Sequence, residues 1–193
     1  MAQNSQFLEI EFKWVLQNLG QVDSLRAQLH QKTCLKKFSV SVDDTYFFSP
    51  RYPDLIFRHR VDPLLQQLTV KSAFQGDVVV RREINLALAQ AAGSQIISVQ
   101  AFLCALDPQM KQAAIQKDVE VFEFLDHEIV IYRATHESSK KSLWCLEVEV
   151  TKFTTPESAM TRLSQLAEEI QLDPKDREPK SLFELLIGTT KDL

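Results

Sequence analysis

The chain of 193 residues is poor in glycine and cysteine, with only four glycines and three cysteines. Cys34, Cys104 and Cys145 are odd in number, far apart and never in a Cys-x-x-Cys spacing, which disfavours a disulfide framework or a zinc ribbon. Neither a Gly-x-x-x-x-Gly-Lys loop nor a Gly-x-Gly-x-x-Gly fingerprint occurs, so P-loop and dinucleotide-binding enzymes have no support. We expect the cysteines to be reduced and to lie in the core.

Long apolar runs are also missing. No stretch approaches the ~18 consecutive apolar residues of a membrane span, and residues 1–6 lack the basic and hydrophobic regions of a signal peptide. No Ser/Gly-rich or Pro-rich tract divides the chain, which predicts a single domain over residues 1–193. We therefore expect a cytoplasmic protein that does not bind a membrane.

The charge balance is slightly acidic. The chain has 26 Asp and Glu residues against 22 Lys and Arg, which gives a net charge of −4. Such a field does not favour the backbone of a nucleic-acid duplex, and we expect no duplex among the partners. Any anion that binds must therefore meet a local cluster of cations.

Five segments alternate apolar and polar residues with the period of two that is typical of β-strands. They cover residues 8–14, 56–61, 68–71, 79–86 and 145–151. In the first segment, Glu9, Glu11 and Lys13 share one face, opposite an apolar face. Together the charged faces carry five cations and five carboxylates: Lys13, Arg58, Arg60, Lys71, Arg81, Glu9, Glu11, Glu83, Glu147 and Glu149.

Four segments carry helical periodicity, at about residues 23–32, 86–106, 156–170 and 181–187. Thr154 with Glu157, and Ser181 with Glu184, resemble capping boxes at the start of the last two. One alternating strand alone is most simply explained by a solvated sheet face. Five strands with clustered charges and an apolar opposite face instead predict an α+β fold, an antiparallel barrel with a charged lumen and helices packed outside.

A charged lumen needs partners for its ions, because each unpaired buried ion costs several kcal/mol. Arginine and lysine supply the donors that phosphoryl oxygens accept, and paired glutamates offer the hard oxygen ligands that Mg²⁺ or Mn²⁺ requires. A small-molecule polyphosphate that carries a divalent cation satisfies both groups. This is the ligand that the charge pattern predicts.

The first alternating segment resembles a known family signature. Glu9-Ile10-Glu11-Phe12-Lys13 is similar to the Glu-x-Glu-x-Lys motif of the CYTH family, also called triphosphate tunnel metalloenzymes. The other marks of the family follow in order: Asp44-Thr45-Tyr46-Phe47, Arg58-His59-Arg60, Lys71, Arg81-Arg82-Glu83, Glu147-Val148-Glu149 and a closing helix from Lys180 to Leu186. The resemblance spans nearly the whole chain.

The resemblance implies an eight-stranded antiparallel tunnel that hydrolyses or cyclises triphosphates with Mg²⁺ or Mn²⁺. It implies that metal is held by Glu9, Glu11, Glu147 and Glu149, assisted by Glu83. It implies that phosphate is bound by Lys13, Arg58, Arg60, Lys71, Arg81 and Lys117. We expect the catalytic roles at Glu147 and Glu149, which would hold an ion that activates water, and at Lys13.

Two positions depart from the family pattern. Lys117 is followed by Asp118 and Val119, where the family has Lys-x-Arg, so one phosphate-facing arginine is missing. The late aspartate that precedes the final Glu-x-Glu has no equivalent in residues 129–135. Arg133 could replace the missing cation if its side chain faces the lumen.

These features favour a metal-dependent hydrolase of inorganic triphosphate or of an organic triphosphate, because hydrolysis needs only phosphate-binding cations and metal ligands. A class IV-type adenylate cyclase is one alternative, although it also requires an adenine pocket. A polyphosphate or nucleotide binder that is non-catalytic or weakly active is the other, and the two departures keep it open. We expect a monomer or a homodimer.

Overall fold

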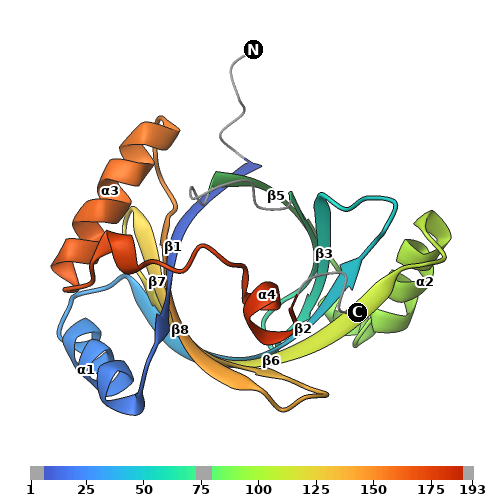
Figure 1. Ribbon diagram of the computed structural model, residues 1–193, viewed down its shortest axis with the longest axis horizontal. Coiled ribbons are helices and arrows are strands. Elements are labelled where there is room, and N and C mark those ends of the chain that lie inside the picture. Colours follow the sequence, from blue (N-terminus) through green and yellow to red (C-terminus); the bar gives the residue numbers. More distant parts are fainter. Residues whose placement is uncertain (1–6, 73–79, 189–193) are drawn as a thin grey trace.

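The computed structural model describes residues 7–72 and 80–188. Eight antiparallel strands close into a barrel in the order β1-β5-β4-β3-β2-β6-β7-β8, seen as a ring in Figure 1. This confirms the predicted barrel. Its strands are β1 (Leu8–Leu16), β2 (Lys36–Phe48), β3 (Leu55–Val61), β4 (Gln66–Ser72), β5 (Val80–Ala87), β6 (Lys111–Glu123), β7 (His127–His136) and β8 (Ser142–Val150).

Within the described ranges, four α-helices accompany the barrel: α1 (Leu19–His30), α2 (Ile96–Leu106), α3 (Pro156–Glu169) and α4 (Leu182–Leu186). Two short 3₁₀ turns, η2 (Gln90–Ala92) and η3 (Pro174–Asp176), lie in the connections. None of the helices in the described ranges is long and apolar enough to cross a membrane. Two predictions fall on residues outside the described ranges: the absence of a signal peptide in residues 1–6, and Val79 as the first residue of the fourth predicted strand.

The helix boundaries differ from the sequence-based prediction in three places. The helix predicted over residues 86–106 is too long, because β5 continues to Ala87 and Gly93, with φ of 69°, interrupts the chain before α2. Helix α1 starts earlier than expected, since the Asn18 side chain accepts a hydrogen bond from the Gln21 backbone N–H. In α3 the capping box is formed by Thr155 and Ser158, one residue after the predicted pair.

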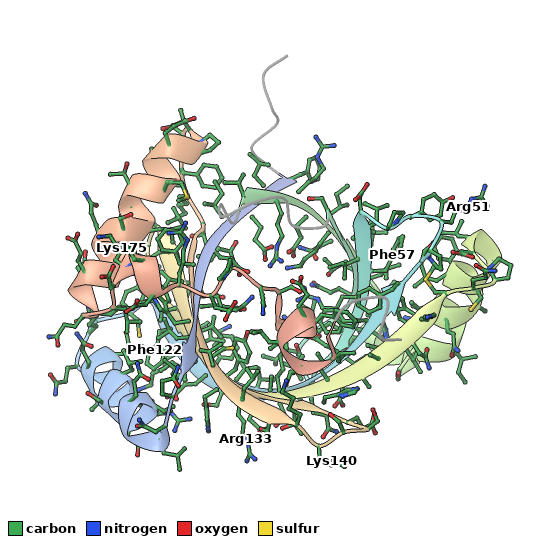
Figure 2. All side chains as sticks on the ribbon, in the orientation of Figure 1. Arg51, Phe57, Phe122, Arg133, Lys140 and Lys175 are labelled. Atoms are coloured by element: carbon green, nitrogen blue, oxygen red, sulfur yellow. The ribbon has the colours of Figure 1, made fainter. Side chains whose placement is uncertain are left out.

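On β1, β3, β4, β7 and β8 an apolar face points outward and packs under helices. Helices α1 and α3 cover β1, β7 and β8. Phe122 of β6 lies between the barrel strands and α1 (Figure 2). Helix α2 covers a second cluster through Val99 and Leu103, on the outer face of β2, β3 and β4. The cysteines are free, with Cys145 buried and Cys34 and Cys104 half-buried, so the expectation of core positions holds for Cys145 alone.

Helix α4 forms a third cluster at one end of the barrel. Leu182, Phe183 and Leu186 pack against inward-facing residues that include Tyr46 and Phe48. The ring centroids of Phe48 and Phe183 are 3.9 Å apart, and Figure 1 shows α4 within the outline of the ring. The capping box of Ser181 and Glu184 starts this helix as predicted. Helix α4 therefore narrows one mouth of the lumen.

We predict that Phe183→Ala lowers the free energy of unfolding by about 3 kcal/mol, because it removes a buried ring from this contact and leaves a cavity. Urea denaturation of both proteins measures the change. Ile97→Ala is the matched control, since Ile97 is 80% exposed on α2, and we expect a change within about 0.5 kcal/mol. Equal stability of F183A and the unaltered protein would contradict the packing of α4.

Candidate functional site

The lumen contains one cavity of about 450 Å³. Every residue that the sequence predicted for the site lines it: Glu9, Glu11 and Lys13 of β1, Arg58 and Arg60 of β3, Lys71 of β4, Arg81 and Glu83 of β5, Lys117 of β6, and Glu147 and Glu149 of β8. Segments far apart in the sequence thus bring their charged side chains to one place. The interior side chains are drawn in Figure 2.

Strand register explains this convergence. In β1 the period of two turns Glu9, Glu11 and Lys13 inward together. Antiparallel pairing sets Glu11 opposite Glu149 and Lys13 opposite Glu147 on β8. On the other side of β1, Glu9 lies opposite Arg81 of β5. The inward residues of β1 therefore lie beside carboxylates of β8 on one side and beside a cation of β5 on the other.

The cations of β4 and β5 are paired with the glutamates of β1. Lys71 Nζ lies 2.7 Å from Glu9 Oε1, and Arg81 also forms an ion pair with Glu9. Arg81 Nη2 donates to Glu11 Oε1 at 2.6 Å. Glu83 forms an ion pair with Lys71, so its carboxylate lies among cations that the sequence assigned to phosphate. The lumen neutralises its own charge at these positions.

Asp44 is a buried carboxylate that holds two of the predicted phosphate-binding cations. Arg60 donates from Nε and Nη2 to its two oxygens, each at 2.8 Å, and Lys117 Nζ lies 2.8 Å from Oδ2. Burial opposes ionisation, but Arg60 and Lys117 hold the pKa of Asp44 well below its usual range. Asp44 belongs to the motif Asp44-Thr45-Tyr46-Phe47, but the sequence-based prediction did not include it among the site residues. Its period-two spacing from Tyr46, which lines the cavity, was the available signal.

Glu147 is held in its charged form. Lys13 Nζ lies 3.2 Å from Glu147 Oε1, and the Tyr132 hydroxyl donates to the same oxygen at 2.7 Å. Burial would raise the pKa of Glu147, but Lys13 and Lys117 outweigh it and lower the pKa to about 2. Tyr132 was missed by the sequence reasoning, because an inward tyrosine on an apolar strand carries no charge signal.

Glu11 and Glu149 have the opposite electrostatic character. Burial, followed by the charges of Glu147 and Glu9, raises the pKa of Glu11 to about 7. Burial, followed by the charges of Glu9 and Glu11, raises the pKa of Glu149 to about 9. Carboxylates that crowd together in a buried place favour a cation between them. This part of the lumen holds an excess of acidic groups, whose charged forms a divalent ion would stabilise.

The carboxylate donors suit Mg²⁺ or Mn²⁺ by chemistry, since both ions prefer hard oxygen ligands. Among the described residues no three Asp, Glu, His or Cys side chains are arranged to hold a metal ion. The ion pairs of Glu9 with Lys71 and of Glu11 with Arg81 explain this arrangement. A metal at Glu11 and Glu149 therefore requires these arginine and lysine contacts to be exchanged for contacts with an anion.

Arg58 offers a direct contact for such an anion. Its Nη2 donates to Thr69 Oγ1 at 3.3 Å and lies 3.8 Å from Glu83 Oε1. Its Nε is buried and has no hydrogen-bond partner in the part of the chain that the structure describes. Leaving a buried charged donor unsatisfied is costly, so this nitrogen favours an acceptor oxygen within the lumen.

The structure also shows what stands at the two positions that depart from the family pattern. Val119 lines the cavity where the resemblance implied an arginine. Arg133 is exposed, donates to Ser142 Oγ at 2.9 Å and points away from the barrel (Figure 2), so it does not replace that cation. On β7 the acidic residue that lines the cavity is Glu128, which lies opposite Glu149. Glu128 directly precedes residues 129–135, in which the sequence showed no equivalent of the family's late aspartate.

The barrel is similar to solved structures of low sequence identity. The PH1012 protein of Pyrococcus horikoshii has a TM-score of 0.74 at 18% identity, covering 92% of this chain and 99% of its own. A Hippeastrum protein described as an adenylyl cyclase with a dominant triphosphatase activity has a TM-score of 0.60 at 15% identity, over 92% and 94%. The mimivirus capping enzyme triphosphatase has a TM-score of 0.58 at 12% identity, over 85% and 90%.

These neighbours confirm the predicted fold, a closed antiparallel barrel with helices outside. No protein-family model and no curated sequence matches the chain. At such identities the likeness defines the architecture, and the roles of the residues in the lumen must come from their own chemistry.

We predict that Asp44→Asn lowers the free energy of unfolding by about 3 kcal/mol, because Arg60 and Lys117 lose their shared buried carboxylate. Added inorganic triphosphate is expected to raise the melting temperature of D44N more than that of the unaltered protein, since it supplies negative charge at the same place. Asp118→Asn, on the exposed face of β6, is the matched control. Stability of D44N equal to that of D118N would contradict this assignment.

We also predict that Mn²⁺ binding to the protein saturated with inorganic diphosphate, which supplies the required anion, releases protons. At pH 7.5 Glu149 is protonated and Glu11 partly so, and a metal ion binds only their charged forms. The Mn²⁺ affinity should therefore rise by about tenfold per pH unit for each proton released. Calorimetry in buffers of different ionisation enthalpy measures the release, and Glu149→Gln should reduce it. Mn²⁺ affinity that is constant from pH 7 to 9 would contradict the role of Glu149.

Proposed function

We propose that this protein is a metal-dependent triphosphatase that binds its substrate in the charged lumen. The observation that carries the proposal is the pairing of two buried sets of groups in one cavity. One set consists of cations suited to phosphoryl oxygens, and the other consists of carboxylates whose raised pKa values favour a divalent cation. A triphosphate with its counterion supplies what both sets need.

Phosphate binding would fall to Lys13, Arg58, Arg60, Lys71, Arg81 and Lys117. Arg58 Nε already lacks a partner among the described residues, and Asp44 orients Arg60 and Lys117 from behind. Arginine offers a planar pair of donors that matches phosphoryl oxygens, and lysine offers a point charge. In this proposal the cations would surround a short chain of phosphates.

Metal binding would fall to Glu9, Glu11, Glu147 and Glu149, with Glu83 beside Glu9. When bound, Mg²⁺ or Mn²⁺ neutralises phosphoryl charge and lowers the pKa of a water molecule. Substrate entry lets Arg81 and Lys71 transfer from glutamate to phosphate oxygens, which frees Glu9 and Glu11. Lys13, held by Glu147, would neutralise the charge that develops on the transferred phosphoryl group. Phosphoryl transfer needs mainly such positioning and neutralisation.

The structural neighbours support hydrolysis, since two of them are described as triphosphatases. The adenylyl cyclase description of the Hippeastrum protein makes cyclisation an alternative to test. The third alternative, a binder without turnover, is supported by Val119, which leaves the lumen one cation short of the family pattern.

We predict that Glu149→Gln lowers the Mn²⁺-dependent release of phosphate by about 100-fold, because it removes a ligand needed in the transition state. The assay offers inorganic triphosphate, thiamine triphosphate and ATP with Mg²⁺ or Mn²⁺. Glu168→Gln, an exposed glutamate on α3, is the matched control and should keep full activity.

Each outcome separates the alternatives. Full turnover by E149Q would show that Glu149 does not act in the reaction. Formation of cyclic AMP from ATP would identify a cyclase. Tight binding of triphosphates without any product would identify a binder.

A further inference from the structure

One part of the lumen carries no charge. The inward positions of β2 before Asp44 are Phe38, Val40 and Val42, and strand pairing places apolar residues beside them. Val40 lies opposite Val119, and Phe38 lies opposite Val121. Val130 of β7 continues the surface, opposite Val121. These six residues line the cavity, and we call them the apolar wall: Phe38, Val40, Val42, Val119, Val121 and Val130.

The apolar wall lies on the far side of the charged residues from α4. Along β2, Asp44 separates Val42 from Tyr46 and Phe48, which contact α4. Along β6, Lys117 separates Val119 and Val121 from Ala113 and Ile115 of the α4 cluster, although Val119 and Val130 also lie against other members of that cluster. The wall therefore lies toward the other mouth of the barrel, where Leu64 and Leu65 of the β3–β4 turn also line the cavity and are 67% and 37% exposed.

Packing within the fold explains only part of the wall, because Val119 and Val130 lie against the cluster that contains α4. Phe38, Val40 and Val42 belong to none of the three apolar clusters described above, and neither does Val121. Phosphate groups gain nothing from valine side chains, so a substrate made only of phosphates leaves this surface unused. An apolar group that lies against it would be removed from water, which is favourable in proportion to its area. A cavity of about 450 Å³ falls in the size range of sites for whole organic ligands.

Two carboxylates border the wall, Glu147 opposite Val130 and Glu128 at the preceding inward position of β7. The polar groups at its other edges are already engaged. Asp62 Oδ1 accepts hydrogen bonds from the backbone N–H groups of Leu64 and Leu65, each at 2.7 Å. Gln67 Nε2 donates to Asn85 Oδ1 at 3.1 Å. Lys36 Nζ lies 4.5 Å from the centroid of the Phe38 ring. A nucleobase needs donors and acceptors for its edge, whereas a hydrocarbon needs none.

We propose that the substrate is an organic triphosphate whose end phosphate carries an apolar, hydrocarbon-like group, and that this group lies against the apolar wall. The proposal rests on the triphosphatase function proposed above. Val42 is the cross-strand partner of Lys117, so the substituted phosphate would lie at Lys117 and Arg60. The unsubstituted end would then extend toward Lys13 and Glu149.

The reaction balances as an ordinary hydrolysis. The oxygen of water forms a bond to the terminal phosphorus, and the anhydride bond to the middle phosphate breaks. The bridging oxygen leaves with its electron pair on the organic diphosphate, inorganic phosphate is the second product, and the proton of water passes to solvent. The hydrocarbon group is unchanged and serves only recognition.

The test compares kcat/KM for inorganic triphosphate, butyl triphosphate, octyl triphosphate and ATP under Mn²⁺. We expect octyl triphosphate to exceed inorganic triphosphate and ATP by at least about tenfold, with butyl triphosphate between, since apolar pockets reward added methylenes by such factors. Val121→Thr keeps the side-chain shape and should lower the ratio of octyl to inorganic turnover by about tenfold. Val61→Thr, on the outer face of β3, is the matched control and should leave that ratio unaltered.

Binding to the unaltered protein gives a readout that needs neither turnover nor a variant. Calorimetry with octyl diphosphate and inorganic diphosphate should show tighter binding of the octyl compound by about tenfold. Equal affinities, or ATP as the best substrate, would overturn the assignment of the wall. If no triphosphate is hydrolysed while the octyl preference in binding remains, the triphosphatase function fails and the role of the wall stands.

Discussion

The burial of opposite charges inside a closed barrel is the constraint on which this structure depends. Each ion in the lumen has lost its water, so it must be neutralised by a neighbour or by a ligand. Asp44 with Arg60 and Lys117 forms the permanent part of this network, because both contacts are close and the carboxylate is fully buried. Glu11 and Glu149 form the part whose negative charge the protein alone does not stabilise, because their pKa values are raised.

This division separates structural ion pairs from ligand-binding ones. A network that served only stability would leave every charge paired, and replacing it with apolar residues would cost little. Here Arg58 Nε lacks an acceptor in the described part of the chain while Glu149 is surrounded by other carboxylates. The Arg58 donor needs an acceptor oxygen, and the crowded carboxyl groups around Glu149 need a cation. A ligand that carries both an anion and a cation removes them together.

Much of the site could be predicted because alternate residues of a barrel strand face the lumen and the outside. Once Glu9, Glu11 and Lys13 alternate with buried apolar residues, closure of the sheet leaves them no place except the lumen. The contribution of uncharged residues was harder to see. Tyr132 and Val119 are uncharged inward residues. On β6 the charged residues Asp118 and Glu120 lie on the outward face, so placing the charged face in the lumen gives the wrong orientation there. The helix boundary near Gly93 was missed because the leucines and alanines between the end of β5 and Gly93 extend the helical pattern of α2.

The apolar wall and the charged residues follow from the same strands. Successive inward positions of β2 run from Phe38, Val40 and Val42 to Asp44, and those of β6 run from Val121 and Val119 to Lys117. The boundary between the two surfaces is thus fixed by backbone register and cannot move without shifting both strands. A ligand bound by these cations would therefore lie beside the wall. In the proposal made above, the apolar wall would select between a bare phosphate chain and a substituted one, while the cations would bind the phosphates.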